Sequence, residues 1–261
     1  GKTPLEKGQF IHLQGADAVA GSILVKKRTK IGPVEIAIAA TVGKAHIEVE
    51  SKPHVHIFST GDEIVGLHET PADHQIRSSN VMMLKSVLLS KGFKANSSHL
   101  ADSAEKIKAS FDKVLESNDI ILLSGGVSAG KKDLIPGALA EAGFKTVFHK
   151  ISQKPGKPML VATRPDGKVV FAFPGNPIST LTCFWVYFLP WVSGEWPEYN
   201  VKEIKFLPKP SAELDQWIPV EKGEVLAHNG SGDLINWSRA DGLVWQAAGD
   251  KSKKLPYIPL K

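Results

Sequence analysis

The chain has 261 residues, of which 42% are hydrophobic and 23% are charged, and this is the composition of an ordinary globular protein. The formal net charge of +5 is small and dispersed, and no apolar run is long enough to span a bilayer, so neither nucleic acid nor a membrane is an expected partner. The single cysteine, Cys183, excludes an intrachain disulfide and favours the reducing cytoplasm as the compartment.

A leading segment, residues 1–53, contains several glycines and few long periodic stretches. Residues 36–40 predict a short helix, and Pro33 is typical of the first position of such a helix. Residues 44–50 alternate between apolar and polar side chains, and this alternation predicts a strand. We therefore expect a small first domain that ends near Pro53.

Strands and helices alternate in the central segment, residues 54–197. A capping-box pattern begins at Asp102, and Asp133 is the expected N-cap of a helix that begins near Leu134. This alternation indicates an α/β domain of three layers, in which helices cover both faces of a largely parallel sheet. The predicted strands are 54–58, 93–99, 119–123, 144–148, 158–162 and 168–173, and the predicted helices are 77–91, 102–115, 134–143 and 177–191.

The helical pattern stops after Pro197. Residues 201–206 and 243–245 alternate as short strands, and Pro, Gly and Asn interrupt the stretches between them. We expect residues 198–261 to form an all-β domain of about 60 residues, a small barrel or a sandwich.

A glycine-rich loop, Ser124-Gly-Gly-Val-Ser-Ala-Gly-Lys-Lys-Asp133, directly follows the apolar run 119–123. Glycines at the carboxyl end of a buried strand allow backbone N–H groups to approach a phosphate. The loop resembles a nucleotide-binding P-loop, but Lys132 stands where the magnesium-binding Ser or Thr is required. Asp133 is suited to capping the next helix, to contacting a ligand, or to both. The sequence therefore predicts binding of a phosphorylated small molecule.

Three further loops are expected at the same edge of the sheet, where ligands of open α/β sheets bind. Each one taken alone is ordinary turn chemistry. In the loop Lys154-Pro-Gly-Lys-Pro158, a Pro-Gly turn holds two lysines three residues apart, and this arrangement suits an oxyanion. Carboxylates in the loop Ser59-Thr-Gly-Asp-Glu63 could bind a divalent ion or a cationic ligand. The loops are Ser59-Thr-Gly-Asp-Glu63, Lys154-Pro-Gly-Lys-Pro158 and Pro174-Gly-Asn-Pro177.

In their order and spacing these four segments resemble the MoeA family of molybdopterin molybdenumtransferases, which includes the carboxyl-terminal domain of gephyrin. Two more segments resemble that family on either side of its central domain, which is similar to the MogA and MoaB adenylyltransferases. Gly15-Ala-Asp17 and Lys30-Ile-Gly-Pro33 resemble the part before it. Gly230-Ser-Gly-Asp233 and Ala240-Asp-Gly-Leu243 resemble the family's carboxyl-terminal β-barrel.

The resemblance implies that the central domain binds adenylylated molybdopterin, and that molybdate is inserted into the pterin dithiolene with release of AMP. It implies Mg²⁺ as the metal ion, with Glu63, Asp102 and Asp133 as its carboxylate ligands, and catalytic roles for Asp133, Glu63, Lys154 and Lys157. The residues implied to bind the pterin nucleotide are Thr60, Gly61, Ser124, Gly125, Gly126, Ser128, Pro174, Gly175, Asn176 and Ser231.

Members of the family carry a further segment ahead of the part matched here, including an elongated domain that reaches the partner subunit. The chain is therefore expected to be a fragment, a processed product or a naturally short form, in which residues 1–53 are a remnant of the family's leading domain. Ligand binding is expected to survive this loss more readily than turnover. A homodimer and a partnership with a molybdopterin adenylyltransferase are expected from the same resemblance. Two other functions stay open. One is adenylylation of molybdopterin with ATP, and the other is a non-catalytic binding or scaffold module.

Overall fold

The computed structural model describes residues 4, 7–101, 103–127 and 134–260, and the chain divides into two units, residues 1–51 and 52–261. Ser128 and Asp133 of the glycine loop, and Asp102, lie outside the described residues. Among the described helices, none combines the length and the hydropathy that crossing a membrane requires.

Helix α1 (Pro33–Thr41) lies in the first unit and confirms the helix predicted there. Pro33 occupies its first turn, and the Glu35 carboxylate accepts a hydrogen bond from the Gly32 N–H at 2.8 Å. The strand predicted at residues 44–50 is wrong, because this stretch is exposed and pairs with no strand of the described chain. Alternating side chains form a strand only where a second strand can satisfy the backbone groups.

A six-stranded sheet in the order β4-β1-β5-β9-β8-β6 forms the centre of the second unit. The first four strands in this order are parallel, and β8 and β6 continue the sheet in antiparallel pairing. The largely parallel sheet expected from the sequence is confirmed. The strands are β1 (Val55–Thr60), β4 (Ala95–Leu100), β5 (Ile120–Ser124), β6 (Lys145–His149), β8 (Leu160–Thr163) and β9 (Val169–Phe173).

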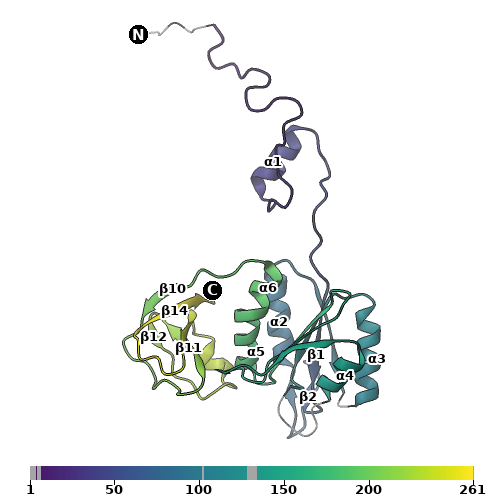
Figure 1. Cartoon of the computed structure of the whole chain (residues 1–261), viewed down its shortest axis with the longest axis vertical. Helices are drawn as coiled ribbons and strands as arrows, with labels where there is room; N and C mark the ends of the chain where they lie inside the picture. Colours follow the sequence, from purple (N-terminus) through teal and green to yellow (C-terminus); the bar gives the residue numbers. More distant parts are fainter. Residues whose placement is uncertain (1–3, 5–6, 102, 128–133, 261) are drawn as a thin grey trace. The chain divides into compact units, whose positions relative to one another are not determined.

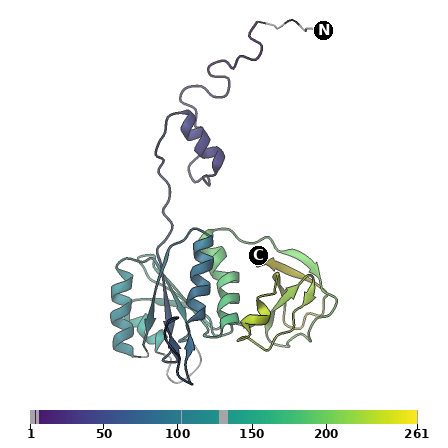
Figure 2. The same ribbon diagram turned by 180° about the vertical axis from the view of Figure 1, so that it is seen from behind.

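Helices cover both faces of this sheet, as Figures 1 and 2 show from opposite sides. On one face, α2 (Ser79–Ser90) and the helix that begins with α5 (Pro177–Cys183) pack on a core that includes Ile57, Leu122 and Phe173. On the other face, α3 (Ala104–Leu115) and α4 (Ile135–Glu141) pack on a core that includes Phe58 and Ile121. Neighbouring strand residues thus point into opposite cores, which completes the three predicted layers.

Three helix starts differ from the prediction. Helix α2 begins at Ser79 rather than at residue 77, because Ile76–Arg77 forms a short strand, β3, that pairs with β2 (Ile64–Val65). Helix α3 has Ser103 as its N-cap, without a side-chain hydrogen bond. Helix α4 has Leu134 as its N-cap, in the place expected for Asp133.

The predicted helix from Pro177 towards Trp191 is confirmed, and it has a π-helical turn at its centre. Helix α5 continues into η1 (Phe184–Phe188) and then α6 (Leu189–Ser193). The Leu189 N–H donates to the Phe184 carbonyl, five residues back. Pro190 follows within the first turn of α6, where its missing N–H interrupts the regular helical pattern.

The carboxyl-terminal part is a second sheet in the order β10-β14-β13-β11-β12, with antiparallel neighbours. Its strand pairings run as an open path from β10 to β12, so the barrel stays a prediction. The short helix α7 (Leu234–Trp237) was not expected after Pro197. The strands are β10 (Asn200–Glu203), β11 (Asp215–Glu221), β12 (Glu224–Val225), β13 (Gly242–Gln246) and β14 (Lys254–Pro259).

A buried cluster and a strand pairing are among the contacts that join this second sheet to the α/β part. Ile178 and Val186, on the helix that begins with α5, pack in one buried cluster with Trp217 and Trp237 of the carboxyl-terminal part. In addition, β7 (Gln153–Lys154) leaves the α/β part and pairs in parallel with β11. The loop that carries the paired lysines is therefore held by the second sheet.

Two adjacent leucines of α2 test this packing. Leu88 is 0% exposed and Leu89 is 71% exposed, so Leu88→Ala removes buried contacts while Leu89→Ala removes few. We expect Leu88→Ala to lower the free energy of unfolding by about 2–5 kcal/mol. Leu89→Ala, the matched control, should change it by less than about 0.5 kcal/mol. Urea denaturation measures both, and equal losses would contradict the placement of α2.

Candidate functional site

The candidate site lies where three parallel strands end at the same level. Ser59 of β1 is in register with Ser124 of β5, and Ser124 is in register with Phe173 of β9. The loops that follow these strands therefore leave the sheet side by side. They border a cavity of about 420 Å³, within the usual size range of ligand pockets. We call this the first pocket.

The glycine turn at the end of β5 is packed so tightly that only glycine fits. Gly125 and Gly126 have φ angles of +100° and +71°, and the Gly125 N–H donates to the Phe173 carbonyl at 3.0 Å. A Cβ on Gly125 would overlap the Thr60 hydroxyl, and a Cβ on Gly126 would lie 2.7 Å from Ile135 Cγ1. The turn is therefore pressed between the end of β1 and the start of α4.

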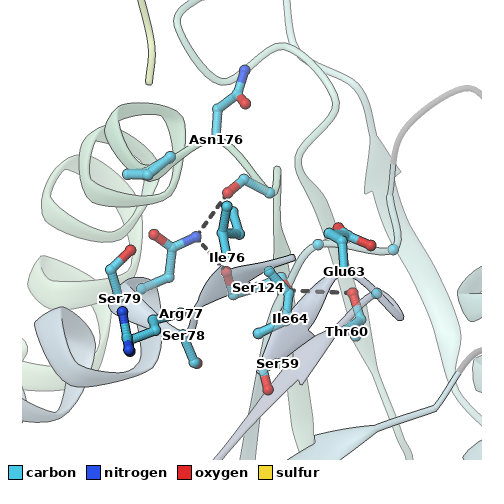
Figure 3. A pocket seen from close by; sticks show the side chains of 16 residues that line it. Ser59, Thr60, Glu63, Ile64, Ile76, Arg77, Ser78, Ser79, Ser124 and Asn176 are labelled. Atoms are coloured by element: carbon cyan, nitrogen blue, oxygen red, sulfur yellow. Dashed lines mark hydrogen bonds between the residues drawn. The ribbon is translucent and has the colours of Figure 1, made fainter. Parts of the chain in front are cut away.

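Gly61 has the same requirement on the neighbouring loop. Its φ angle is +108°, and a Cβ there would overlap the Glu63 carboxylate. The Glu63 side chain is thereby folded back over the turn at the rim of the first pocket. Figure 3 shows Glu63 and Thr60 on one side of this pocket, and Arg77, Ser78 and Ser79 on the other.

Asn80, which the sequence analysis did not select, connects the loops around the first pocket. Its Nδ2 lies 2.8 Å from Ser124 Oγ, 2.8 Å from the Gly175 carbonyl and 3.3 Å from Thr180 Oγ1. One amide at the start of α2 thus holds the loops after β5 and β9. Its Oδ1 is buried without a hydrogen-bond partner in the described chain. The only signal in the sequence was the polar run Arg77-Ser-Ser-Asn80, which resembles an ordinary helix start.

Arg77 was also not predicted to be a site residue, and it adds a guanidinium to the lining of the first pocket. Its Nε donates to the Leu67 carbonyl at 3.2 Å, which holds the base of this group. The lining therefore carries a cation from Arg77, a carboxylate from Glu63, and several hydroxyl and backbone groups. Such a set can bind an anionic ligand that also carries hydrogen-bonding groups.

The paired-lysine loop lies at a different pocket from the glycine turn. Lys154 and Ser231 line a cavity of about 500 Å³ between the start of α5 and the carboxyl-terminal sheet, and we call it the second pocket. Trp217, Trp237 and His228 give this pocket an aromatic wall. The four loops expected at one site are thus divided between two.

One hydrogen bond makes the two pockets neighbours. The Asn176 Nδ2, on the lining of the first pocket, donates to the hydroxyl of Ser231, on the lining of the second, at 2.8 Å. The backbone repeats the contact, because the Ile178 N–H donates to the Ser231 carbonyl at 2.9 Å. The start of α5 therefore forms the border between the pockets.

The remaining predicted site residues have the following places. Pro174 is buried behind the first pocket, where its carbonyl accepts from Thr180 Oγ1 at 2.6 Å. Lys157 is exposed, and its carbonyl accepts from the Ile151 N–H at 2.8 Å. Within the described ranges, no three His, Cys, Asp or Glu side chains are close enough to hold a metal ion together.

The sequence profile of the family described as "Probable molybdopterin binding domain" matches residues 56–194, more than half of the chain. A molybdopterin molybdenumtransferase of Synechocystis is 35% identical over 246 residues, which is 92% of this chain and 63% of that protein. A protein of the same description from Synechococcus elongatus is 37% identical over 182 residues, 68% of this chain and 45% of that protein. The chain thus spans less than two thirds of the length of these relatives.

A solved structure from Pyrococcus horikoshii, the molybdopterin biosynthesis MoeA protein, has the same fold. It superposes with a TM-score of 0.73 at 28% identity, over 92% of this chain and 61% of that one. A second structure of a MoeA protein from this organism gives 0.70 at 20% identity, over 94% of this chain and 62% of that one. The chain therefore belongs to the molybdopterin-binding domain family, and its relatives over most of its length are MoeA-type molybdopterin molybdenumtransferases.

Proposed function

We propose that this chain is the substrate-binding core of a molybdopterin molybdenumtransferase, which inserts molybdate into adenylylated molybdopterin and releases AMP. The observation that carries the proposal is the pair of neighbouring pockets. One is built on a glycine turn suited to a phosphate, and the other contains a lysine suited to an oxyanion. A reaction that joins a phosphorylated pterin to a metal oxyanion needs two such sites side by side.

The first pocket would hold the pterin nucleotide. Gly125 and Gly126 line this pocket beside Ser124 and Thr60. Because the Gly125 N–H already donates to the Phe173 carbonyl, the Gly126 N–H and the two hydroxyls are the groups proposed to contact the ligand. These groups would bind phosphate and pterin oxygens, together with Gly61, Gly175 and Asn176 on the facing loops. Ser128 would extend the same loop, and Pro174 would shape it from behind. Arg77 would neutralise charge on the ligand.

The second pocket would hold molybdate. Lys154 lines it directly, and Lys157 follows in the same Pro-Gly turn. Both ammonium groups would lower the energy of a doubly charged oxyanion brought beside the nucleotide. The Ser231 hydroxyl, already bonded to Asn176, would donate to the anion from the carboxyl-terminal part.

Mg²⁺ is the metal ion that this proposal includes, with Glu63, Asp102 and Asp133 as its ligands. Glu63 fits this role, because it presents a hard carboxylate oxygen at the rim of the first pocket. A bound Mg²⁺ would neutralise phosphate charge. The carboxylates themselves would orient the nucleotide. Asp133, the last residue of the glycine-rich loop, would act as the acid–base group.

Assembly is a further part of the proposal. The family resemblance supports a homodimer, and the adenylylated substrate requires an adenylyltransferase to make it. Transfer between the two enzymes would protect a reactive intermediate, so an adenylyltransferase is the partner we propose.

The proposed function predicts AMP release from adenylylated molybdopterin, at a rate that rises with added molybdate. Chromatography of the nucleotide products measures it, in the presence of magnesium. Binding of the intact nucleotide without release would limit the chain to a binding core. Formation of adenylylated molybdopterin from ATP would instead establish the adenylyltransferase activity. A folded chain that binds no pterin nucleotide would contradict the proposal.

Asn80→Ala should weaken binding of adenylylated molybdopterin about tenfold, because it releases the loops that carry Ser124 and Gly175. Loss of one hydrogen-bonding partner at a partly buried site costs about 1–3 kcal/mol, and 1.4 kcal/mol corresponds to tenfold. Asn200→Ala, an exposed asparagine on β10, is the control and should leave the affinity unchanged. Equal affinities for both variants would show that Asn80 does not organise the pocket.

Gly125→Ala should weaken the same binding and lower stability by roughly 1–2 kcal/mol, because alanine resists a φ angle of +100° and its Cβ meets Thr60. Gly137→Ala is the matched control on α4, where a Cβ would meet no atom of the described residues within 4 Å outside the helix's own backbone. That change should stabilise the chain by roughly 0.5–1 kcal/mol and leave binding alone. Calorimetry and thermal unfolding test both, and unaltered affinity in Gly125→Ala would count against the phosphate role of the turn.

A further inference from the structure

A buried glutamine, Gln153, lies at the base of the paired-lysine loop and is 3% exposed. Its Oε1 accepts a hydrogen bond from the Tyr187 hydroxyl of η1 and one from Trp217 Nε1 of β11, the latter at 3.2 Å. Its Nε2 donates to the Pro155 carbonyl at 2.8 Å, within the loop itself. One side chain thus connects the loop with a helix of the α/β part and with the carboxyl-terminal sheet.

The hydroxyl of Tyr187 is a donor in this arrangement. Burial is the main cause that raises the pKa of Tyr187 to about 12, and the nearby Cys183 is the second cause and acts in the same direction. The phenol therefore keeps its proton at neutral pH, and the Gln153 Oε1 is the acceptor that it faces. Since Trp217 Nε1 can only donate, the orientation of the Gln153 amide is determined by its two neighbours.

The turn that follows is packed directly on Gln153. Gly156 has a φ angle of +102°, and a Cβ there would lie 2.8 Å from Gln153 Nε2 and would overlap Cys183 Sγ. The Cys183 thiol lies 3.6 Å from the Gly156 carbonyl and is also buried. The Pro-Gly turn therefore has little freedom to move independently of the glutamine.

The backbone on the other side of the glutamine is held by the carboxyl-terminal sheet. Gln153 pairs with Asp215, and Lys154 pairs with Gln216, in the parallel β7–β11 ladder. The Lys154 side chain itself is exposed and has several rotatable bonds. The backbone at its base therefore fixes the point from which this flexible side chain extends, and with it the region that the ammonium group can reach.

We propose that Gln153 is a positioning residue, through which Tyr187 and the carboxyl-terminal sheet direct Lys154 into the second pocket for oxyanion binding. This inference rests on the proposed function, because it presumes that Lys154 binds molybdate. It assigns a task to the carboxyl-terminal part, which supplies the backbone partner and the Trp217 donor that hold the lysine in place.

Molybdate binding to the full chain, measured by isothermal titration calorimetry with molybdate alone, tests the inference. Gln153→Met keeps the size of the side chain and removes its hydrogen bonds, and we expect the dissociation constant to rise about tenfold. Tyr187→Phe removes one donor and should raise it about threefold. Binding of adenylylated molybdopterin, which uses the first pocket, should stay unchanged in both variants. General damage to the fold would affect both ligands.

A double variant shows whether Gln153 acts through the lysine. If it does, Gln153→Met added to Lys154→Ala should cause no further loss beyond that of Lys154→Ala alone. Losses that multiply would overturn the inference, as would unchanged molybdate affinity in Gln153→Met and Tyr187→Phe. Unchanged affinity in Lys154→Ala alone would instead overturn the assignment of molybdate to the second pocket, and with it the proposed function. If Gln153→Met does not fold, Tyr187→Phe combined with Lys154→Ala gives the same comparison.

Discussion

The aligned ends of β1, β5 and β9 are the constraint on which the rest of the structure depends. Parallel strands expose their carboxyl ends at one edge, and the register of Ser59, Ser124 and Phe173 brings three loops to one level. The chain turns sharply directly after β1 and β5, and each of these turns contains a glycine with a positive φ angle, Gly61 and Gly125. The same turns line the first pocket, so the sheet supports both the fold and the candidate site.

The loops on this edge are joined by a few polar side chains rather than by a continuous apolar core. Asn80 ties the loops after β5 and β9, and Asn176 ties the start of α5 to Ser231. Amide side chains can do this because each carries both donors and an acceptor. The Gln153 contacts follow the same principle at the second pocket. Both pockets therefore depend on amide side chains that are fixed by their own hydrogen bonds.

Much of the fold was predictable from the sequence, because buried parallel strands such as Ile120–Ser124 are continuous apolar runs and α3 shows a clear apolar face. The false strand at residues 44–50 arose because alternation describes a strand's two faces but not whether a partner exists. Asn80 was missed because a polar residue at a helix start usually caps it. The division into two pockets depends on β7 pairing with β11, a contact between segments about 60 residues apart that no local pattern contains.

The helix that runs through α5, η1 and α6 is shared by two cores. Phe184 and Phe188 face the central sheet, while Ile178 and Val186 face Trp217 and Trp237 of the carboxyl-terminal part. If the second sheet detached, the back of this helix would meet water with its apolar side chains exposed. Separation of the two parts would therefore destabilise the same helix that covers one face of the central sheet. Melting of either part would loosen the other, and thermal denaturation of residues 52–261 would proceed as one cooperative event.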